Sequence, residues 1–540
     1  MKNLKELSPK YVLVNNIKLP INASFEEAFS VARKKLSSFG TGCEAKPFIY
    51  KRSIDARKKD NIYFVYSVAF DISELSHADL QKLPSDCILS VEEPEISIGD
   101  EALSAPPVIV GSGPCGLFCA LLLAEYGYRP ILLERGDSVS NRKKAVSDFY
   151  SRHILDSECN IQFGAGGAGT FSDGKLVTRV NDPLCNYVLK RFVEFGAPDD
   201  IRFIAKPHVG TDILSVVVDR ILQRIEELGG KILYNTRFEY PIESFGRVVG
   251  VHTSVGDFAA GALVLAIGHS ARDTYSSLIC RGVDIQAKSF SVGMRIEHLA
   301  SDIDEAMLGR FAGHPKLGHA EYNLSHNTKE RGVYTFCMCP GGEVVAAASE
   351  EGGVVVNGMS YHARASENSN SAVVCSVFKE DFGSTALAAI DFQRKIERDA
   401  FTAGGGEYKA PVITVGDFLC DKLEAEPKRV LPSYMGGNNF TIKAPSDYLP
   451  KFVTDGIKGA LVDFDKKIKG FASKDAILTG AETRTSSPVR ILRDNDTRLA
   501  IGYSNFYPSG EGAGYAGGIT SAAIDGLKTA VAIISKFKPN

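Results

Sequence analysis

Residues 108–136, VIVGSGPCGLFCALLLAEYGYRPILLERG, decide the fold of this 540-residue chain. The run PPVIV at 106–110 is short and apolar and is followed directly by glycine, which is typical of a buried parallel strand. Residues 114–126 predict a helix, and the run PILLE at 130–134 predicts a second strand. A strand, a glycine turn, a helix and a strand in this order predict a βαβ unit of an α/β fold.

Three glycines of this unit, Gly111, Gly113 and Gly116, have the spacing GxGxxG. Gly111 permits the tight turn, Gly113 lets backbone amides approach a pyrophosphate, and Gly116 lets the helix pack close to the strand. Glu134 ends the second strand, 18 residues after Gly116, where a carboxylate accepts hydrogen bonds from the hydroxyls of a ribose. The unit therefore predicts a dinucleotide site, and the charge of Glu134 disfavours the 2′-phosphate of NADP there.

The expected helix carries two cysteines, Cys115 and Cys119, which lie four residues apart and therefore on one face. A helix that packs on a sheet buries such a face, where free cysteine behaves as a small hydrophobic residue. The helix N-terminus would lower the pKa of Cys115 if this thiol were exposed. We expect packing, with a reactive thiol as the alternative.

Three later segments decide which dinucleotide binds. Residues 160–176, NIQFGAGGAGTFSDGKL, form a second glycine cluster that suits backbone lying close against a flat cofactor or its phosphates. The apolar run at 262–268, ALVLAIG, ends in small residues that permit close approach. Residues 507–526, YPSGEGAGYAGGITSAAIDG, place glycines before a C-terminal helix whose N-terminus favours an anionic flavin ring. Together these segments favour FAD.

These residues carry a resemblance to the FAD-dependent oxidoreductases of the glutathione-reductase-like, two-domain flavoprotein superfamily, through GSGPCG with Glu134, the strand end VLAIGH and the C-terminal GEGAGYAGGI. Further motifs, among them SIDARKKDNIYFVY, GHSARDTY, GMRIEH, FCMCPGG and GAETRTSSPVRI, resemble a family of largely uncharacterised bacterial FAD-dependent dehydrogenases over nearly the whole chain. The resemblance implies bound FAD, a discontinuous FAD domain and an inserted substrate domain. It implies no known substrate.

The candidate FAD contacts combine this resemblance with the glycine clusters. The superfamily match implies that the first glycine turn meets the pyrophosphate, that Glu134 holds the adenosine ribose, and that Gly510–Gly514 lie near the isoalloxazine and the ribityl chain. Arg135 and Arg142 follow the acid and are candidates for a second phosphate or the substrate. The complete expected set is Gly111, Ser112, Gly113, Pro114, Cys115, Gly116, Glu134, Arg135, Arg142, Gly164, Gly166, Gly167, Thr170, Ala266, Gly268, Gly510, Glu511, Gly512, Ala513, Gly514, Gly518 and Ile519.

Two sequence features of the disulfide reductases in that superfamily are missing. Those enzymes place a redox CxxxxC pair soon after the acid-bearing strand, where this sequence has only Cys159. No second GxGxxG with a strand, a helix and an acid follows for NAD(P)H. The pattern therefore argues against a disulfide reductase. NAD(P)H would bind another surface as a transient electron donor, or the substrate itself would reduce the flavin.

Three polar side chains are candidate catalytic groups. His269 follows the Ala-Ile-Gly turn, where it is either a proton donor or a hydrogen-bonding loop residue. Arg295 alternates with Glu297 in GMRIEH, so the two share one strand face and either pair with each other or bind substrate. Arg484 lies in GAETRTSSPVRI, a polar run that suits anion or substrate contacts, with an ordinary solvated loop as the alternative.

The composition excludes several classes of protein. The formal net charge of −3 gives no electrostatic case for a nucleic-acid partner. The apolar runs fall short of a membrane span and the first residues lack a signal-like apolar region, so we expect a cytoplasmic protein with no membrane partner. The eleven cysteines are scattered and lack zinc spacing, so neither a disulfide scaffold nor a metal is expected. Cys337 and Cys339 share one face of an expected strand, either as buried packing or as a redox pair.

The expected fold class is a multidomain α/β and α+β chain. It comprises a small N-terminal α+β domain (1–100), a Rossmann-like FAD domain in two parts (101–284 and 471–540), and an inserted substrate or cap domain with a mixed or antiparallel sheet (285–470). We expect an FAD-dependent oxidoreductase, dehydrogenase-like, that acts on a small organic substrate; the oligomeric state stays open. The alternative is a flavoprotein whose N-terminal domain, with the basic run YKRSIDARKK, binds a macromolecule for RNA modification or protein–protein electron transfer.

Overall fold

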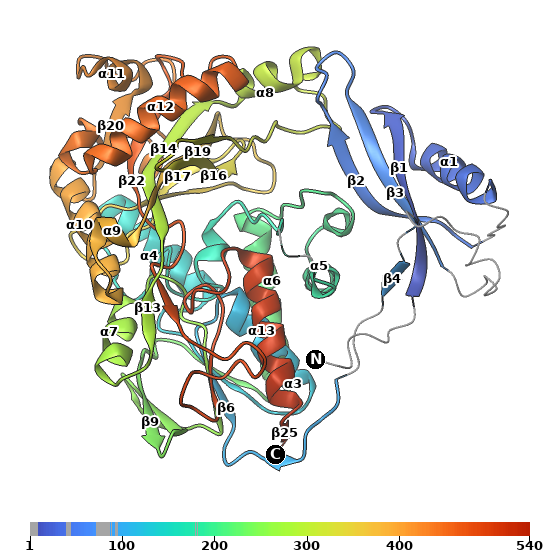
Figure 1. The fold of residues 1–540 in the computed structure, drawn as a ribbon, viewed down its shortest axis with the longest axis vertical. Helices are drawn as coiled ribbons and strands as arrows, with labels where there is room; N and C mark the ends of the chain where they lie inside the picture. Colours follow the sequence, from blue (N-terminus) through green and yellow to red (C-terminus); the bar gives the residue numbers. More distant parts are fainter. Residues whose placement is uncertain are drawn as a thin grey trace.

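The computed structural model describes residues 9–38, 45–71, 87, 89–91, 96–178, 180 and 182–539. The chain is a mixed α/β multidomain protein with three larger sheets, of four, five and seven strands. Figure 1 shows the four-stranded N-terminal unit, in blue, standing at one side of the other two sheets.

The five-stranded sheet contains the βαβ unit predicted from residues 108–136. Its strand order is β24-β12-β6-β7-β8, and each neighbouring pair runs parallel. The adjacent strands β6 and β12 are buried throughout, which explains their continuous apolar sequence. The strands are β6 (Pro107–Val110), β7 (Ile131–Leu133), β8 (Lys231–Leu233), β12 (Ala262–Leu265) and β24 (Phe506–Pro508).

The helix α3 (Pro114–Glu125) follows β6 as predicted, and ten consecutive residues from Cys115 to Ala124 are buried. This helix is apolar all round because α13 (Ile519–Ile534) and α6 (Thr211–Glu227) both pack against it (Figure 1). The chain's last helix therefore completes the unit that begins about 400 residues earlier. Around it lie α4 (Val139–Arg152), α5 (Leu184–Glu194), α7 (Arg272–Cys280) and an antiparallel sheet of β9 (Phe238–Ser244), β10 (Arg247–Thr253) and β11 (Gly256–Ala259).

The seven-stranded sheet has the order β15-β16-β19-β14-β22-β20-β21. The strand β22 follows residue 470, the expected end of the inserted domain, and pairs with β14 and β20, whereas the other six strands lie within the expected range 285–470. The strands are β14 (Phe290–Leu299), β15 (Ser325–Asn327), β16 (Gly332–Cys339), β19 (Asn368–Val377), β20 (Ala410–Thr414), β21 (Phe440–Ile442) and β22 (Ile477–Glu482).

Helices and short ladders cover this sheet and join it to the rest of the chain. The helix α12 contacts β14, β16 and β19, and the β17–β18 ladder contacts β14, β19 and other strands of the sheet. The helices are α8 (Ala300–Leu308), α9 (Lys379–Phe382), α10 (Ala386–Ala403), α11 (Val415–Cys420) and α12 (Lys451–Lys467). The two-stranded ladders pair β17 (Glu343–Ala346) with β18 (Val356–Met359), β13 (Ile285–Ala287) with β23 (Val489–Ile491), and β5 (Glu101–Ala102) with β25 (Phe537–Lys538).

Among its described residues, the N-terminal unit has the strand order β2-β3-β1-β4 and the helix α1. A capping box between Ser24 and Glu27 starts α1 (Phe25–Ser37), as the sequence Ser-x-x-Glu predicts. Part of the basic run YKRSIDARKK contacts other parts of the chain. The backbone of Arg52 bonds to the 203–205 segment, and its guanidinium lies over two phenylalanine rings. The strands are β1 (Pro9–Pro20), β2 (Phe48–Asp55), β3 (Tyr63–Asp71) and β4 (Leu89–Val91).

In the part of the chain that the structure describes, no helix has both the length and the apolar character that crossing a membrane requires. Within the same residues, no group of three or more His, Cys, Asp or Glu side chains is placed to hold a metal ion.

Candidate functional site

The turn between β6 and α3 leaves no room for a side chain at Gly111 or Gly116. Gly111 has a φ of +96°, and a Cβ there would lie 2.4 Å from the carbonyl oxygen of Ala266. A Cβ on Gly116 would lie 1.8 Å from the carbonyl oxygen of Gly111. Gly113 is the N-cap of α3 and makes no side-chain cap hydrogen bond, so the first amides of the helix are available to an anion. The turn has the form that a pyrophosphate requires.

The second glycine cluster lies directly against this turn. A Cβ on Gly167, whose φ is +62°, would lie 2.9 Å from the Cα of Gly113. The amide of Gly166 donates to the carbonyl oxygen of Ser112 at 3.1 Å. Two loops about 50 residues apart in the chain therefore form one cradle of bare backbone. Such a cradle accommodates an extended, phosphate-bearing cofactor, and the residues present fit FAD.

Glu134 holds the two loops together. Its side chain is 4% exposed. Oε2 accepts from the amide and the hydroxyl of Ser112 at 3.0 and 2.6 Å, and Oε1 accepts from the amides of Gly136 and Gly164 at 3.0 and 2.9 Å. These four donors match the capacity of a carboxylate. A ribose hydroxyl would have to share these oxygens with protein donors, so the structure gives Glu134 a positioning role that the sequence did not predict.

The two arginines that follow Glu134 are also bound to protein groups. Arg142 is fully buried and donates to backbone carbonyls of the 160–167 segment at 2.8 to 3.2 Å, so its guanidinium supports the second glycine loop. Burial lowers the pKa of Arg142 to about 10. Arg135 bonds to Glu158 and Asp273 at the rim of the molecule. Both guanidinium groups therefore donate to protein groups, Arg142 to the second glycine loop and Arg135 to two carboxylates.

Cys115 and Cys119 pack inside this unit. Cys115 is 4% exposed and Cys119 is fully buried. Burial raises the pKa of Cys115 and of Cys119 well above the ordinary value of a thiol, so neither is a thiolate at neutral pH. A Cβ on Gly526 would lie 2.0 Å from the carbonyl oxygen of Cys115, which shows how closely α13 crosses α3. The packing interpretation agrees with this environment.

The strand end of β12 and the C-terminal glycines meet at the other end of the cradle. A Cβ on Gly512 would lie 2.4 Å from the carbonyl oxygen of Gly268, and one on Gly510 would lie 2.9 Å from the Cβ of Cys115. The N-cap of α13 is Gly518, and no side chain forms a cap hydrogen bond there. The first amides of α13 are therefore not used by a side-chain cap. Of the remaining expected contacts, Thr170 and Ala513 are buried within these loops.

Two titratable side chains, Glu511 and His269, lie close together at this end, and we call them the Glu511–His269 pair. His269 Nε2 lies 4.0 Å from Glu511 Oε1, and the Glu511 side chain is 27% exposed. Burial raises the pKa of Glu511 to about 7, against the opposing charge of Lys288. Burial and the positive charges of Arg484 and Arg272 lower the pKa of His269 to about 3, so this ring is neutral. Glu511 is therefore the group of this pair that titrates near neutral pH.

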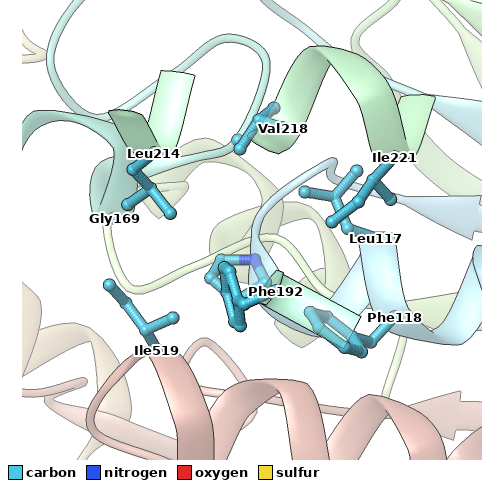
Figure 2. Close-up of a pocket in the computed structure, with 10 residues that line it drawn as sticks. Leu117, Phe118, Gly169, Phe192, Leu214, Val218, Ile221 and Ile519 are labelled. Atoms are coloured by element: carbon cyan, nitrogen blue, oxygen red, sulfur yellow. The ribbon is translucent and has the colours of Figure 1, made fainter. Parts of the chain in front are cut away.

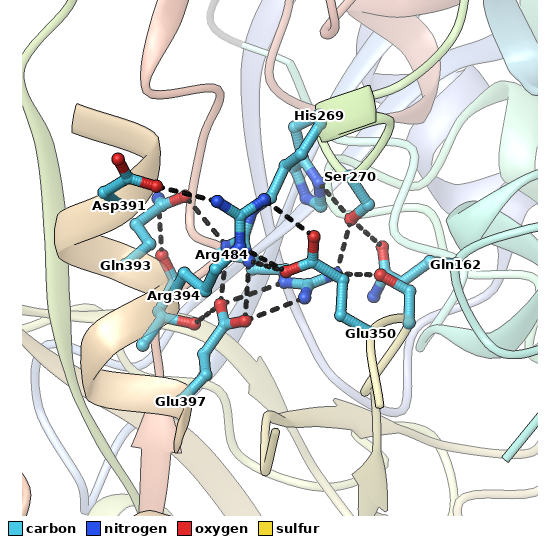
Figure 3. A network of polar contacts seen from close by, with 12 residues as sticks. Gln162, His269, Ser270, Glu350, Asp391, Gln393, Arg394, Glu397 and Arg484 are labelled. Carbon is cyan, nitrogen blue, oxygen red and sulfur yellow. Dashed lines mark hydrogen bonds and ion pairs between the residues drawn. The ribbon is translucent and has the colours of Figure 1, made fainter. Parts of the chain in front are cut away.

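Arg484 takes part in a buried network of charges, shown in Figure 3. Its guanidinium and that of Arg272 both bond to Glu397 of α10, at 2.9 Å and 2.7 Å for the closest ion-pair contacts. Burial opposes ionisation, but the two guanidinium groups hold the pKa of Glu397 well below its usual range. Arg484 also donates to the hydroxyl of Ser270, beside His269. It stabilises the junction of α7, α10 and the segment after β22. Its side chain is linked to His269 through the hydroxyl of Ser270.

Arg295 pairs with an acid that its sequence neighbours do not reveal. Its Nε and Nη2 donate to the two carboxylate oxygens of Glu482, at 2.9 and 3.0 Å, because β22 lies beside β14 in the sheet. Glu297 bonds instead to Ser433 and Asn368. The expected pairing of Arg295 with Glu297 is therefore wrong, and the register of β14 with β22 is the physical reason.

A small apolar cavity lies between α3, α6 and α13 (Figure 2). Its volume of about 10 Å³ is about the least that holds one water. Pro114, Gly166, Gly169 and Ile519 contribute to its lining together with larger apolar side chains. The cavity is a packing gap behind the cradle and has no room for a substrate.

Comparison with known proteins identifies the class of the protein. Residues 105–147, which contain the first glycine turn and Glu134, match the family described as FAD binding domain. Residues 289–485 match the family described as FAD-dependent protein, C-terminal domain-like, and residues 13–71 match a domain of unknown function. The protein is an FAD-dependent flavoprotein of the oxidoreductase type, and FAD is its cofactor. The alternative of an RNA-binding or macromolecule-binding N-terminal domain gains no support from these matches.

The chain belongs to the same family as an uncharacterised protein of Clostridium beijerinckii. The two are 46% identical over 536 residues, which cover 97% of this chain and 99% of that protein.

Solved structures also resemble the chain. A glycine oxidase from Bacillus cereus is 10% identical, with a TM-score of 0.32 over 80% of this chain and 95% of that one. An L-amino acid deaminase from Proteus vulgaris is 13% identical, with a TM-score of 0.32 over 83% and 96%. The flavin-dependent brominase Bmp2 is 12% identical, with a TM-score of 0.38 over 79% and 78%.

Proposed function

We propose that the protein is a dehydrogenase-like FAD oxidoreductase that moves electrons between a small organic substrate and bound flavin, with NAD(P)H as a transient electron donor. In this proposal the five-stranded parallel sheet is a Rossmann-like FAD domain of the glutathione-reductase-like superfamily. The turn at Gly111–Gly116 binds the pyrophosphate, and the loop at Gly510–Gly514 borders the flavin. The matches to FAD-dependent families and the two-loop glycine cradle support this assignment.

The observation that carries the proposal is that the Glu511 carboxyl and the His269 ring lie 4.0 Å apart at the end of the cradle. Bound FAD would supply the two-electron chemistry. The protein's part is to hold a proton, and a carboxyl with a pKa of about 7 exchanges a proton readily at neutral pH. Neutral His269 is within 4.0 Å of that carboxyl and is fixed by Ser270 at 3.0 Å. Glu511 would therefore take up or release the proton that accompanies substrate oxidation or reduction.

Anaerobic reduction of the purified protein tests this function. NADH, NADPH and a panel of small metabolites are added in turn, and loss of flavin absorbance is followed, with dithionite as the positive control. We expect at least one physiological donor to bleach the flavin. Glu511→Gln should slow that step at least about 100-fold near pH 7, in the range of a lost acid–base group. A flavin that dithionite reduces but no donor reduces would contradict the proposal.

A further inference from the structure

The strand β16 is distorted at its end, where it carries Cys337. Its register with β19 shifts between Phe336 and Cys339, so Cys337 and Met338 form a bulge. Cys337 has a φ of +44°, the left-handed region that costs a non-glycine residue about 1–3 kcal/mol. Bulges of this kind redirect a side chain and occur beside active sites. The distortion removes Cys337 from the simple alternation of a regular strand.

The thiol of Cys339 lies against the backbone of Cys337. Its Sγ donates to the carbonyl oxygen of Cys337 at 3.3 Å. Cys339 is fully buried, whereas Cys337 is partly exposed. Of the two thiols, Cys337 is therefore the one that a reagent reaches first, and Cys339 lies within one hydrogen bond of its backbone.

The surroundings of Cys337 favour its thiolate. Arg295 donates to the carbonyl oxygen of Cys337 at 3.1 Å, and Lys175 donates to that of Met338, so two cations adjoin the bulge. The hydrogen bond from Cys339 lowers the pKa of Cys337 to about 6, against burial and with help from Arg295 and Lys175. Asp173 opposes this shift.

The bulge also contacts the part of the chain that carries the glycine loops. Lys175, which lies at the end of the second glycine cluster, donates to the carbonyl oxygen of Met338, the residue between the two cysteines. The negative charge of a Cys337 thiolate contributes to raising the pKa of Glu511. The two cysteines therefore lie where strand β16 meets the second glycine loop.

We propose that Cys337 and Cys339 form a thiol–disulfide exchange site for small disulfides, with Cys337 as the attacking thiol and Cys339 as the resolving thiol. The Cys337 thiolate attacks one sulfur of a disulfide RSSR and releases RS⁻, which leaves a mixed disulfide on Cys337. Cys339 then loses its proton to RS⁻ and attacks the Cys337 sulfur, which releases the second RS⁻. Overall, the two protein thiols are oxidised to a disulfide, and RSSR is reduced to RSH and RS⁻. This inference does not depend on the proposed function.

The test uses the flavin-containing protein and hydroxyethyl disulfide, a small neutral probe, followed by digestion and mass spectrometry. In the wild type we expect the 337–339 peptide to lose two hydrogens. In Cys339→Ala we expect the probe to remain attached to Cys337. Cys375→Ala, which removes a buried thiol from the neighbouring strand β19, is the matched control and should behave as the wild type. An unreacted Cys337 in the wild type while the exposed Cys280 reacts would overturn the proposal.

Alkylation by iodoacetamide at pH 6.5 provides an independent measurement. With the pKa of Cys337 near 6 in the wild type and near the ordinary value of about 8.5 in Cys339→Ala, the thiolate fraction falls about 75-fold. The greater nucleophilicity of the more basic thiolate offsets about tenfold of this loss. We therefore expect Cys337 to react about sevenfold more slowly in Cys339→Ala. An unchanged or faster rate would refute the role of Cys339.

Discussion

The substitution Glu134→Gln separates support of the glycine loops from direct contact with the ribose. Glutamine keeps the shape of the side chain but replaces one oxygen with an NH₂ group, which donates. Placed toward Ser112, that NH₂ lets the serine hydroxyl turn and accept, but it leaves the buried Ser112 amide without an acceptor. The amides of Gly136 and Gly164 then bond to a neutral oxygen instead of a charged one.

The expected loss follows from these contacts. An unpaired buried amide costs about 1–3 kcal/mol, and each change from a charged to a neutral acceptor costs about 1 kcal/mol. The apoprotein should therefore lose about 3–5 kcal/mol of stability. FAD affinity should fall at least about tenfold, because a smaller fraction of the protein then has both loops in the arrangement that binds.

Urea denaturation of the apoprotein, followed by far-UV circular dichroism, measures the first effect, and quenching of FAD fluorescence measures the second. Glu158→Gln is the matched control, because that acid forms ion pairs at the rim with its side chain 37% exposed. It should change stability by less than about 1 kcal/mol. If Glu134→Gln weakened FAD binding but left the apoprotein as stable as the wild type, Glu134 would act on the ligand alone and the reasoning would be refuted.

Three further predictions concern other parts of the site. Glu397→Gln removes the carboxylate that buried Arg484 and Arg272 share, although Arg272 keeps its ion pair with Glu350, and should cost about 3–5 kcal/mol in urea denaturation. Asp391→Asn, at an exposed pair on the same helix, should cost less than about 1 kcal/mol. Because the pKa of Glu397 is lowered in the folded state, its stabilisation is present above about pH 4.5 and disappears on acidification, so the Glu397→Gln deficit should shrink as the pH falls. The pH dependence expected for Glu511 has the opposite sign, because its pKa is raised to about 7 in the folded state. Between pH 4.5 and 8 the wild-type apoprotein should lose at most about 3 kcal/mol of stability relative to Glu511→Gln. Parallel pH profiles of the two proteins would contradict this. Gly167→Ala should weaken FAD binding more than Gly352→Ala, since both glycines have positive φ but only the first Cβ would meet backbone among the described atoms, and equal FAD affinities would argue against the cradle.

The local elements of this protein could be predicted because their information lies within short stretches. The glycine spacing at Gly111–Gly116 and the apolar runs around it predicted β6, α3 and β7 nearly to the residue. Ser24 and Glu27 predicted the start of α1 by their spacing alone. The strand ahead of Gly268 and the C-terminal helix followed from the same kind of pattern. In each case the backbone conformation and the hydrophobic period of one segment sufficed.

The partners of the charged residues could not be predicted in this way. Arg295 shares a strand face with Glu297, yet it pairs with Glu482, which lies 187 residues away and becomes its neighbour only through the register of β14 with β22. Glu134 was expected at a ribose, but the second glycine loop folds back onto it and supplies donors. A charge that is removed from water takes the partner that the fold brings near, wherever that residue stands in the sequence.

The sequence by itself therefore determined that this chain has a βαβ unit with a glycine turn, a second glycine cluster and a C-terminal helix, and that these suit FAD. Spacing decides such features because turns and helix starts depend on neighbouring residues. Only the tertiary structure decided that Cys115 is packing, that Arg484 belongs to a buried charge network, and that Cys337 lies in a bulge of β16. Those roles depend on burial and on contacts between distant strands, which arise when the sheets assemble.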